Sequence, residues 1–545
     1  MSDVARANAS AATDFPFEFA EPGDAELSWE WDDMHMPFAI TPLAGDYAVH
    51  LIGAGLNESY SAFDFPARYH AAAWNGYVYY AYAPNVPEAE RKAVNARFDD
   101  LCRARAEVTA AWWTNEAIPE LRALYASVDG IAVDDLTGGA LADAWLGAWA
   151  AMERAWRIHF IAILGPYQAV SDLADAYEKA VPGAPPGEAM RLVQGMSPDL
   201  FDVAVALDDI VAQAIRAPEV VARLASDPPP SLEELARLPG GAPTVDRIEA
   251  FLAAHGHLGQ AHDDLAQPSY GEEPRLLLSD VAKRLERPAK PAAARRSELR
   301  AESERLADDV RARLADRPEE LARFEHLLAL GREIGHLTEG HNYWIDRMAQ
   351  ATLRRLAFRV GERLVREGSL AAPDDVLYLD SHEVAAAIRQ PGDRHGLIGE
   401  RRRAHAYWQG VRPPAKLGKE DAAEEEPSRF GLTRVGSTEP GVLRGKGASP
   451  GVVRGTARVA LSNLDFPRIR PGDIIVSPSS NPSWVPVFTI AGGLVTNTGG
   501  VLSHAAVVAR EFALPAVVGV ADATTSIADG QTIEIDGIQG TVRLL

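Results

Sequence analysis

Apolar residues in the first three quarters of the chain recur every three or four positions, which is the period of an α-helix. One run has successive spacings of four, three, four, three and four: Trp145, Trp149, Met152, Trp156, His159 and Ile163. The same period covers residues 323–367, as one bent helix or two. An extended opening precedes these helices, and the alternating aromatic residues 77–82 predict a strand or a hairpin edge.

The helical pattern ends near residue 412. Residues 413–440 gain proline, glycine and charge, which predicts a flexible, exposed linker. Short apolar runs between glycine and proline turns follow in residues 441–545, and they predict β-strands packed around at least one helix. We therefore expect a multidomain protein, with a large, mostly α-helical domain over residues 1–412, a linker over 413–440 and a small α/β domain over 441–545.

Composition excludes several classes of protein. The 545 residues carry 54 Lys and Arg against 77 Asp and Glu, so the formal net charge is −23. Such a surface repels phosphate backbones, which argues against a nucleic-acid partner. The single cysteine rules out an intrachain disulfide, and the sequence shows neither a membrane-spanning apolar run nor a secretory leader. We expect a soluble cytoplasmic protein with no membrane partner.

One histidine stands out in the C-terminal region. His504 is the only histidine after His405, and it follows a Gly499-Gly500 pair and a potential N-cap, Ser503. In the first helical turn, His504 would lie beside unpaired N–H groups and the positive end of the helix dipole, where an anion is stabilised. Other groups in the segment suit a phosphoryl group on the imidazole: Thr496, Ser503 and the Gly500 N–H as donors, and Arg510 in the same helix. Without further context, a solvated or capping histidine is the more common explanation.

The surrounding residues form the pattern Thr496-x-x-Gly499-Gly500-x-x-Ser503-His504-x-Ala506-x-x-Ala509-Arg510-Glu511. This pattern, together with residues 447–459 and 471–488, resembles the mobile phosphohistidine domain of the phosphoenolpyruvate-utilising enzymes. The resemblance implies that His504 accepts a phosphoryl group at one active site, as a covalent phosphohistidine intermediate. The domain would then swing to deliver that group at a second active site.

Full-length members of this family also contain an ATP-grasp domain that phosphorylates the histidine. No GxxxxGK[ST] loop and no glycine-rich basic stretch of grasp type occurs before residue 440. The resemblance therefore implies a separate ATP-grasp nucleotide-binding subunit, which would bind the ATP and the Mg²⁺. No metal site is predicted for this chain itself.

Three stretches of the helical region, 251–274, 336–347 and 361–384, more weakly resemble the acceptor-binding domain of rifampicin phosphotransferase and its two-component relatives. The rifampicin enzymes carry basic residues near the acceptor hydroxyl, where this sequence has Glu339 and His341 instead. The difference favours another hydroxyl acceptor. The tryptophan run at 145–156 is either part of the core or the wall of a flat, aromatic pocket.

Helical spacing places the residues of this stretch on two faces. Residues 334, 337, 341, 344 and 348 share one face, and His336, Glu339, Tyr343 and Asp346 share another. His341 is then either a buried histidine with a satisfied partner or a base for the acceptor hydroxyl, oriented by Glu339. Additional candidates for contact with the acceptor are Tyr343, Trp344 and His257.

These expectations combine into one predicted reaction. The chain would be the phosphotransferase subunit of a dikinase-type enzyme that converts ATP to AMP and phosphate. His504 would carry the phosphoryl group to a small, phenolic acceptor and give an aryl phosphate, since a phenol with a pKa near 10 needs only modest help from an imidazole. Two alternatives remain: a non-phenolic acceptor such as an antibiotic or a keto acid, and a non-enzymatic, regulatory phosphocarrier.

Overall fold

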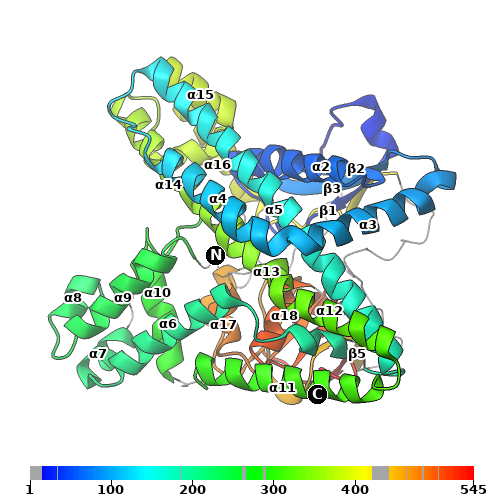
Figure 1. The fold of residues 1–545 in the computed structure, drawn as a ribbon. Helices are drawn as coiled ribbons and strands as arrows, with labels where there is room; N and C mark the ends of the chain where they lie inside the picture. Colours follow the sequence, from blue (N-terminus) through cyan, green and yellow to red (C-terminus); the bar gives the residue numbers. More distant parts are fainter. Residues whose placement is uncertain are drawn as a thin grey trace.

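The computed structural model describes residues 15–545 apart from residues 34, 186, 227, 260–264, 287–289, 420–440, 462, 481–483 and 501–502. It contains a large, mostly helical N-terminal region and a small C-terminal α/β region, as the sequence predicts (Figure 1). Most of the predicted linker lies outside the described residues. Its beginning is part of a strand, Lys416–Gly418, rather than an irregular connection.

A four-stranded antiparallel sheet lies in the N-terminal region, in the order β2-β3-β1-β4. Its strands are β1 Ser28–Trp31, β2 Ala67–Trp74, β3 Tyr77–Pro84 and β4 Lys416–Gly418. The aromatic strand β3 forms the predicted hairpin with β2, but it is an interior strand and not an edge. Because β4 pairs with β1, the end of the helical region returns to its beginning before the chain continues to the C-terminal region.

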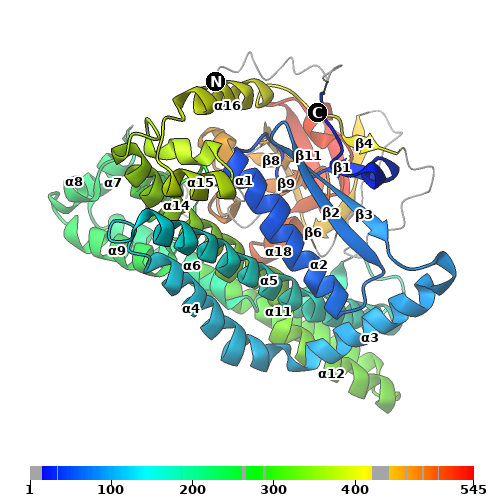
Figure 2. The ribbon, with the colours of Figure 1, turned by 90° about the horizontal axis from the view of Figure 1, so that it is seen from above.

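The long helix α5, Gly138–Ala180, passes through the whole N-terminal region (Figures 1 and 2). Around it pack α1 Pro42–Asp46, a π-helical turn Tyr47–Ile52, α2 Gly53–Ala62, α3 Glu88–Trp112, a second π-helical turn Trp113–Ala117 and α4 Ile118–Asp129. Two further helices near its N-terminal end are α15 Ser381–Arg389 and α16 His395–Trp408. Thr137 caps the first turn of α5, because its side chain accepts a hydrogen bond from Ala140 N–H.

The tryptophans of α5 form part of the core. Trp145, Trp149 and Trp156 are all buried in the largest apolar cluster of the N-terminal region. The Trp145 indole N–H donates to Ser381 O at 2.8 Å, and the Trp156 indole donates to the Tyr47 hydroxyl at 2.9 Å. These rings hold helices together and do not line an open pocket. Over the described residues, no helix is both long and apolar enough to cross a bilayer.

A second group of helices extends from the far end of α5. It comprises α6 Pro198–Ala214, α7 Pro218–Leu224, α8 Leu232–Ala236, α9 Ala242–His255, α10 Pro274–Glu286 and α11 Ala292–Arg313. The predicted helical stretch 323–367 is broken near Gly335. It consists of α12 Pro318–Ile334, α13 Leu337–Asn342, a π-helical turn Tyr343–Arg347 and α14 Met348–Arg366. The break and the π-helical turn lie beside the candidate site.

The C-terminal region is an eight-stranded mixed sheet with the order β5-β12-β11-β7-β8-β9-β10-β6. Strands β7 to β10 run parallel in sequence order, and antiparallel strands flank them on both sides. The strands are β5 Val442–Arg444, β6 Lys446–Ser449, β7 Val452–Val459, β8 Ile474–Ser477, β9 Gly493–Thr496, β10 Ala516–Val518, β11 Thr532–Asp536 and β12 Thr541–Leu544. Its helices are α17 Val485–Phe488, α18 His504–Glu511 and α19 Ala523–Ser526.

The two regions are packed together through apolar side chains. Phe201 of α6 and Leu299 of α11 belong to the same buried cluster as Phe512 and Leu514, which follow α18. In Figure 1 the C-terminal sheet accordingly lies among α6, α11, α12 and α18. The contact presents the N-terminal end of α18 to the break between α12 and α13.

The contact between α2 and α5 gives a stability prediction. A Cβ on buried Gly55 would lie 2.7 Å from the Trp156 carbonyl carbon, whereas one on exposed Gly147 of α5 would meet nothing within 4 Å. Because overpacking forces backbone shifts, G55A should lower the free energy of unfolding by about 1–3 kcal/mol. The control G147A should leave it unchanged or raise it by up to about 1 kcal/mol. Denaturant titration of both variants checks this, and equal midpoints would contradict the tight helix contact.

Candidate functional site

The first turn of α18 has no side-chain cap among the described residues. The helix begins at His504, and Ser503 has the extended backbone of an N-cap (φ −67°, ψ 156°), as predicted. Its hydroxyl donates to Gly500 O at 2.8 Å and forms no hydrogen bond with the first turn. Gly499 has φ +135°, a conformation that side chains rarely adopt. The turn therefore leaves N–H groups of the first helical turn free of a side-chain cap, which is the arrangement that binds phosphate at helix N-termini.

His504 contacts the helical region through one ring nitrogen. Its Nδ1 forms a hydrogen bond with Glu339 Oε2 of α13. The side chains are only 13% and 10% exposed, so the contact is nearly excluded from solvent. Because a carboxylate only accepts, Nδ1 carries the proton, and in the neutral imidazole the lone pair is then on Nε2. Nε2 is itself buried and has no hydrogen-bond partner. Glu339 thus fixes the orientation of the ring and leaves Nε2 available.

Two other predicted phosphoryl contacts are engaged elsewhere in this arrangement. The hydroxyl of buried Thr496 donates to Thr498 O at 2.7 Å, and Arg510 donates to Ala448 O at 3.0 Å. Burial lowers the pKa of Arg510 to about 10, so its guanidinium remains charged near neutral pH. Their contact with a phosphoryl group stays a prediction, as does that of Gly500.

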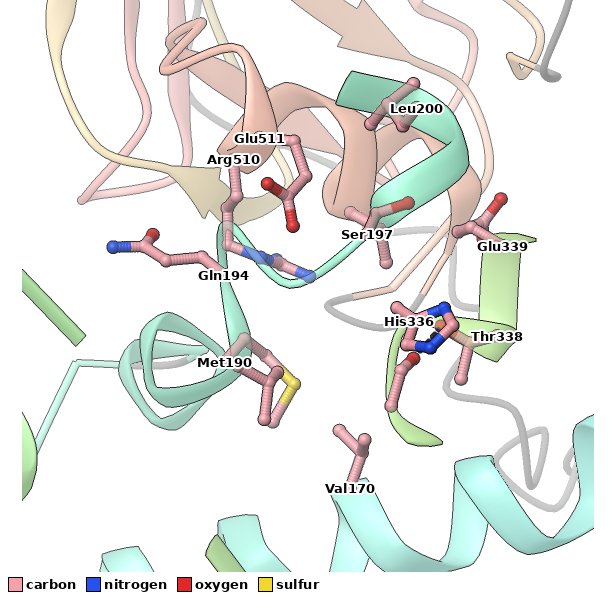
Figure 3. Close-up of a pocket in the computed structure, with 13 residues that line it drawn as sticks. Val170, Met190, Gln194, Ser197, Leu200, His336, Thr338, Glu339, Arg510 and Glu511 are labelled. Carbon is pink, nitrogen blue, oxygen red and sulfur yellow. Dashed lines mark hydrogen bonds between the residues drawn. The ribbon is translucent and has the colours of Figure 1, made fainter. Parts of the chain in front are cut away.

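A small cavity of about 40 Å³ separates α18 from the helical region (Figure 3). In Figure 3 the Arg510 guanidinium and the His336 ring point toward each other across it. Burial lowers the pKa of His336 to about 4, and its Nδ1 has no hydrogen-bond partner. The lining residues are Val170, Met190, Val193, Gln194, Ser197, Leu200, Gly335, His336, Thr338, Glu339, Val507, Arg510 and Glu511. A space of this volume is large enough for a few waters.

A carboxylate at the end of α18 also holds the two regions together. Both oxygens of Glu511 accept from the Gly195 N–H, at 3.0 and 2.8 Å. The Gly195 carbonyl in turn accepts from Arg296 and Arg300 of α11. Burial raises the pKa of Glu511 to about 7, and the Gly195 N–H and the charges of Arg510, Arg296 and Arg300 oppose that rise. This contact therefore depends on pH.

The pH dependence has a definite sign. An acid whose pKa is raised in the docked form favours docking while it is protonated, and this contribution is lost as the pH rises through about 7. We expect small-angle X-ray scattering to show a compact protein near pH 5.5 and a larger share of extended molecules near pH 8. Glu511→Gln should flatten this profile, because glutamine does not titrate. An unchanged profile in that variant would show that Glu511 is not the titrating group.

His341 is buried on the inner side of α13. Its Nδ1 forms a hydrogen bond with Leu337 O at 2.6 Å, so Nδ1 carries the proton and Nε2 the lone pair. Burial lowers the pKa of His341 to about 4, and the charges of Glu339 and His504 also act on it. The imidazole is therefore neutral near pH 7 and lies within electrostatic range of the candidate phosphoryl carrier. Both predicted roles, core histidine and base, fit its burial.

The structure corrects the predicted assignment of residues 334–348 to two helical faces. We predicted Asp346 on the face of Glu339 and on a different face from His341. A π-helical turn spans Tyr343–Arg347, however, and in a π-helix residues five apart are stacked. Asp346 is therefore brought to His341, and His159 of α5 completes a buried group whose ligand atoms lie within 4.8 Å of one another. A period of 3.6 residues per turn does not predict that these side chains meet. They meet because of the π-helical turn.

The predicted acceptor contacts form a separate aromatic group. The Tyr343 hydroxyl contacts His255 Nδ1 at 2.8 Å, and its ring packs edge-on against His257 at 4.5 Å between centroids. Trp344 packs against Tyr343, and its carbonyl accepts from the Tyr125 hydroxyl. Burial lowers the pKa of His257 to about 3. Within the described part of the chain, no hydrogen bond or ring contact joins this group to His504, so acceptor binding here stays a prediction.

Comparison with known proteins identifies the two parts of the site. Residues 469–540 match the family model of the PEP-utilising enzyme mobile domain, and residues 162–339 match that of the rifampicin phosphotransferase fourth domain. These two segments are therefore similar to a PEP-utilising mobile domain and to one domain of rifampicin phosphotransferase. The two matched segments include the residues that meet at the interface, His504 and Glu339. The mobile-domain match bears out the resemblance drawn from the pattern around His504.

Individual relatives cover different shares of the chain. Chondramide synthase of Chondromyces crocatus is 29% identical over 560 residues, which is 98% of this chain and 14% of the synthase. Rifampicin phosphotransferase of a Streptomyces species is 35% identical over 342 residues, 62% of this chain and 39% of that enzyme. The Bacillus cereus rifampicin phosphotransferase is 29% identical over 356 residues, 62% of this chain and 38% of the enzyme. The chain thus spans less than two fifths of each of these relatives.

Proposed function

We propose that this chain is a phosphotransferase that carries a phosphoryl group on His504 and delivers it to the hydroxyl of a small acceptor. One observation carries the proposal: Glu339 holds His504 Nδ1 across the interface, while Nε2 is buried and free of any partner. The contact would hold the ring in the orientation and tautomer that delivers a phosphoryl group from Nε2, which regains its lone pair when the group leaves. The matches to the mobile domain and to rifampicin phosphotransferase support the same reaction class.

The transfer step balances in atoms and charge. The bond between His504 Nε2 and phosphorus breaks, the acceptor oxygen forms a bond to phosphorus, and Nε2 regains its lone pair. His341 activates the acceptor hydroxyl; as a free imidazole, its Nε2 would take the hydroxyl proton. The side chains of His504 and Glu339 are largely buried, which limits the water that can compete with the acceptor for the phosphoryl group.

The phosphoryl group would come from ATP. The family resemblance implies an ATP-grasp nucleotide-binding subunit that holds ATP and Mg²⁺ and releases AMP and phosphate. At that partner, His504 must leave Glu339, so the domain would move between two docking positions. The Glu511 contact and the apolar interface are the interactions that this movement breaks.

A phenol is the first acceptor that we propose. In place of the basic residues of the rifampicin enzymes, this chain has Glu339 and His341, and a phenol loses its proton more readily than an alkyl alcohol. The product would be an aryl phosphate.

The comparisons favour a second acceptor class. Several relatives are named rifampicin phosphotransferase, so the acceptor of those enzymes is an antibiotic. A hydroxyl of an antibiotic is therefore the alternative acceptor for this chain.

A discharge assay distinguishes the acceptors. The chain is first labelled from ATP through an ATP-grasp subunit, then freed of nucleotide and mixed with a panel of phenols, rifampicin and simple alcohols. We expect phenols to remove the label and give an aryl phosphate. If rifampicin is the only compound that removes the label, the acceptor is an antibiotic and not a phenol. Retention of the label against every hydroxyl compound would overturn the transferase proposal and leave a regulatory phosphocarrier.

A further inference from the structure

Three side chains beside His504 form a buried group with the composition of a metal site. They are His159 of α5, His341 of α13 and Asp346 of the π-helical turn, and their residues are 9%, 4% and 2% exposed. One nitrogen or oxygen of each lies within 4.8 Å of those of the other two. Three different elements thus direct potential ligands into one small volume.

Both histidines have a ring nitrogen free to bind an ion. Because Leu337 O accepts from His341 Nδ1, the lone pair of that ring is on Nε2. A carbonyl on the opposite nitrogen is also the usual second partner of a metal-binding histidine. His159 Nδ1 is buried without a hydrogen bond and lies 3.7 Å from Asp346 Oδ1, which is too far for one.

Asp346 provides the strongest indication of a missing cation. Both of its carboxylate oxygens are buried, and neither has a hydrogen-bond partner among the described residues. An ionised carboxylate without partners costs several kcal/mol to bury, so such a group binds a proton or a cation. A metal ion satisfies the carboxylate and both imidazole lone pairs together.

We propose that His159, His341 and Asp346 bind one divalent transition-metal ion. Two imidazoles and one carboxylate suit Zn²⁺, Mn²⁺, Fe²⁺ or Co²⁺, whereas Mg²⁺ prefers oxygen ligands. A tetrahedral ion keeps its ligand atoms roughly 3.3 Å apart. The two imidazoles are stacked, with centroids 4.3 Å apart and an interplanar angle of 20°, so closing the site requires rotation of the rings as well as shortening of the longest separation by up to about 1.5 Å. Three protein ligands leave a coordination position for another oxygen.

The role of this ion rests on the proposed transferase function. The open position would hold the acceptor hydroxyl, and the ion would lower its pKa, as it does for bound water. The His341 Nε2 is then a ligand, so the hydroxyl proton passes to Glu339 while the bond from His504 Nε2 to phosphorus breaks and that to the acceptor oxygen forms. The ion would thereby take over the activation of the hydroxyl that His341 Nε2 provides as a free imidazole.

Metal binding is measured on the full chain without ATP or acceptor. Chelator-treated protein is titrated with Co²⁺, followed by visible absorption and by metal analysis after desalting. We expect one ion per chain, with weakening of at least about 100-fold in Asp346→Asn and in His159→Gln. His326→Gln is the matched control, since this exposed histidine pairs with Glu107 far from the group. It should bind Co²⁺ like the unmodified chain.

A second measurement keeps the proposal testable if a variant fails to fold. Pulsed electron paramagnetic resonance of the unmodified chain with one equivalent of Mn²⁺ should show coupling to imidazole nitrogen. Sub-stoichiometric Co²⁺, equal affinity in folded Asp346→Asn, or no nitrogen coupling would overturn the site and leave a protonated Asp346 beside His159. His504→Gln should bind the ion normally, so failure of the metal site and failure of the phosphoryl carrier are distinguishable.

Discussion

A chain in which His504 is replaced by glutamine will take up no phosphoryl group from ATP. Glutamine retains a donor for Glu339 but has no nitrogen lone pair that can bond phosphorus. Since His504 Nε2 is the proposed site of attachment, uptake should fall to background rather than by a modest factor. The measurement is retention of labelled phosphate after incubation with ATP, Mg²⁺ and an ATP-grasp subunit, with the chain separated without acid.

The control for this experiment is His382→Gln, an exposed histidine at the start of α15. It should charge as fully as the unmodified chain. Circular dichroism and thermal unfolding establish that both variants fold. Uptake that persists in folded H504Q would assign the phosphoryl group to another residue.

Replacement of His341 by alanine should separate charging from discharge. His341 is the proposed base for the acceptor, and its hydrogen bond is to Leu337 O rather than to His504, so the yield of labelled chain should remain unchanged. Discharge to a phenol should slow by about 10²–10⁴-fold, the usual loss on removal of a positioned acid–base group. Single-turnover decay of the labelled chain after addition of acceptor provides the rate.

His326→Gln is again the reference for discharge, because the ring is on the same helical stretch but exposed. It should discharge at the unmodified rate. An equal discharge rate in folded H341A would remove His341 from the transfer step, whether as base or as metal ligand. The His504 carrier would be unaffected by that result.

The C-terminal domain was predictable because its signals are local. Glycines at 499 and 500, the cap at Ser503 and the position of His504 at the start of a helix are all encoded within a few residues, and α18 begins where the pattern places it. The helical region was predictable in class for the same reason, since the apolar period of α5 gives buried side chains. Features that depend on residues close together in the chain could therefore be predicted from the sequence.

Features that depend on contacts between residues distant in sequence could not be predicted. The contact between His504 and Glu339 joins residues 165 positions apart, and no spacing rule predicts it. The pairing of β4 with β1 likewise placed part of the predicted linker in a sheet. Asp346 was assigned to the wrong face because the prediction used 3.6 residues per turn through a π-helical turn. The group formed with His159 was hidden for that reason.

The most direct test follows the phosphoryl group on His504 itself. The unmodified chain, its ATP-grasp subunit, ATP and a phenol are mixed, quenched at neutral or alkaline pH over a time course, and digested for mass spectrometry. The account predicts that phosphorylated His504 forms before the aryl phosphate and decays as product accumulates. Product that accumulates while residue 504 is never phosphorylated would contradict it.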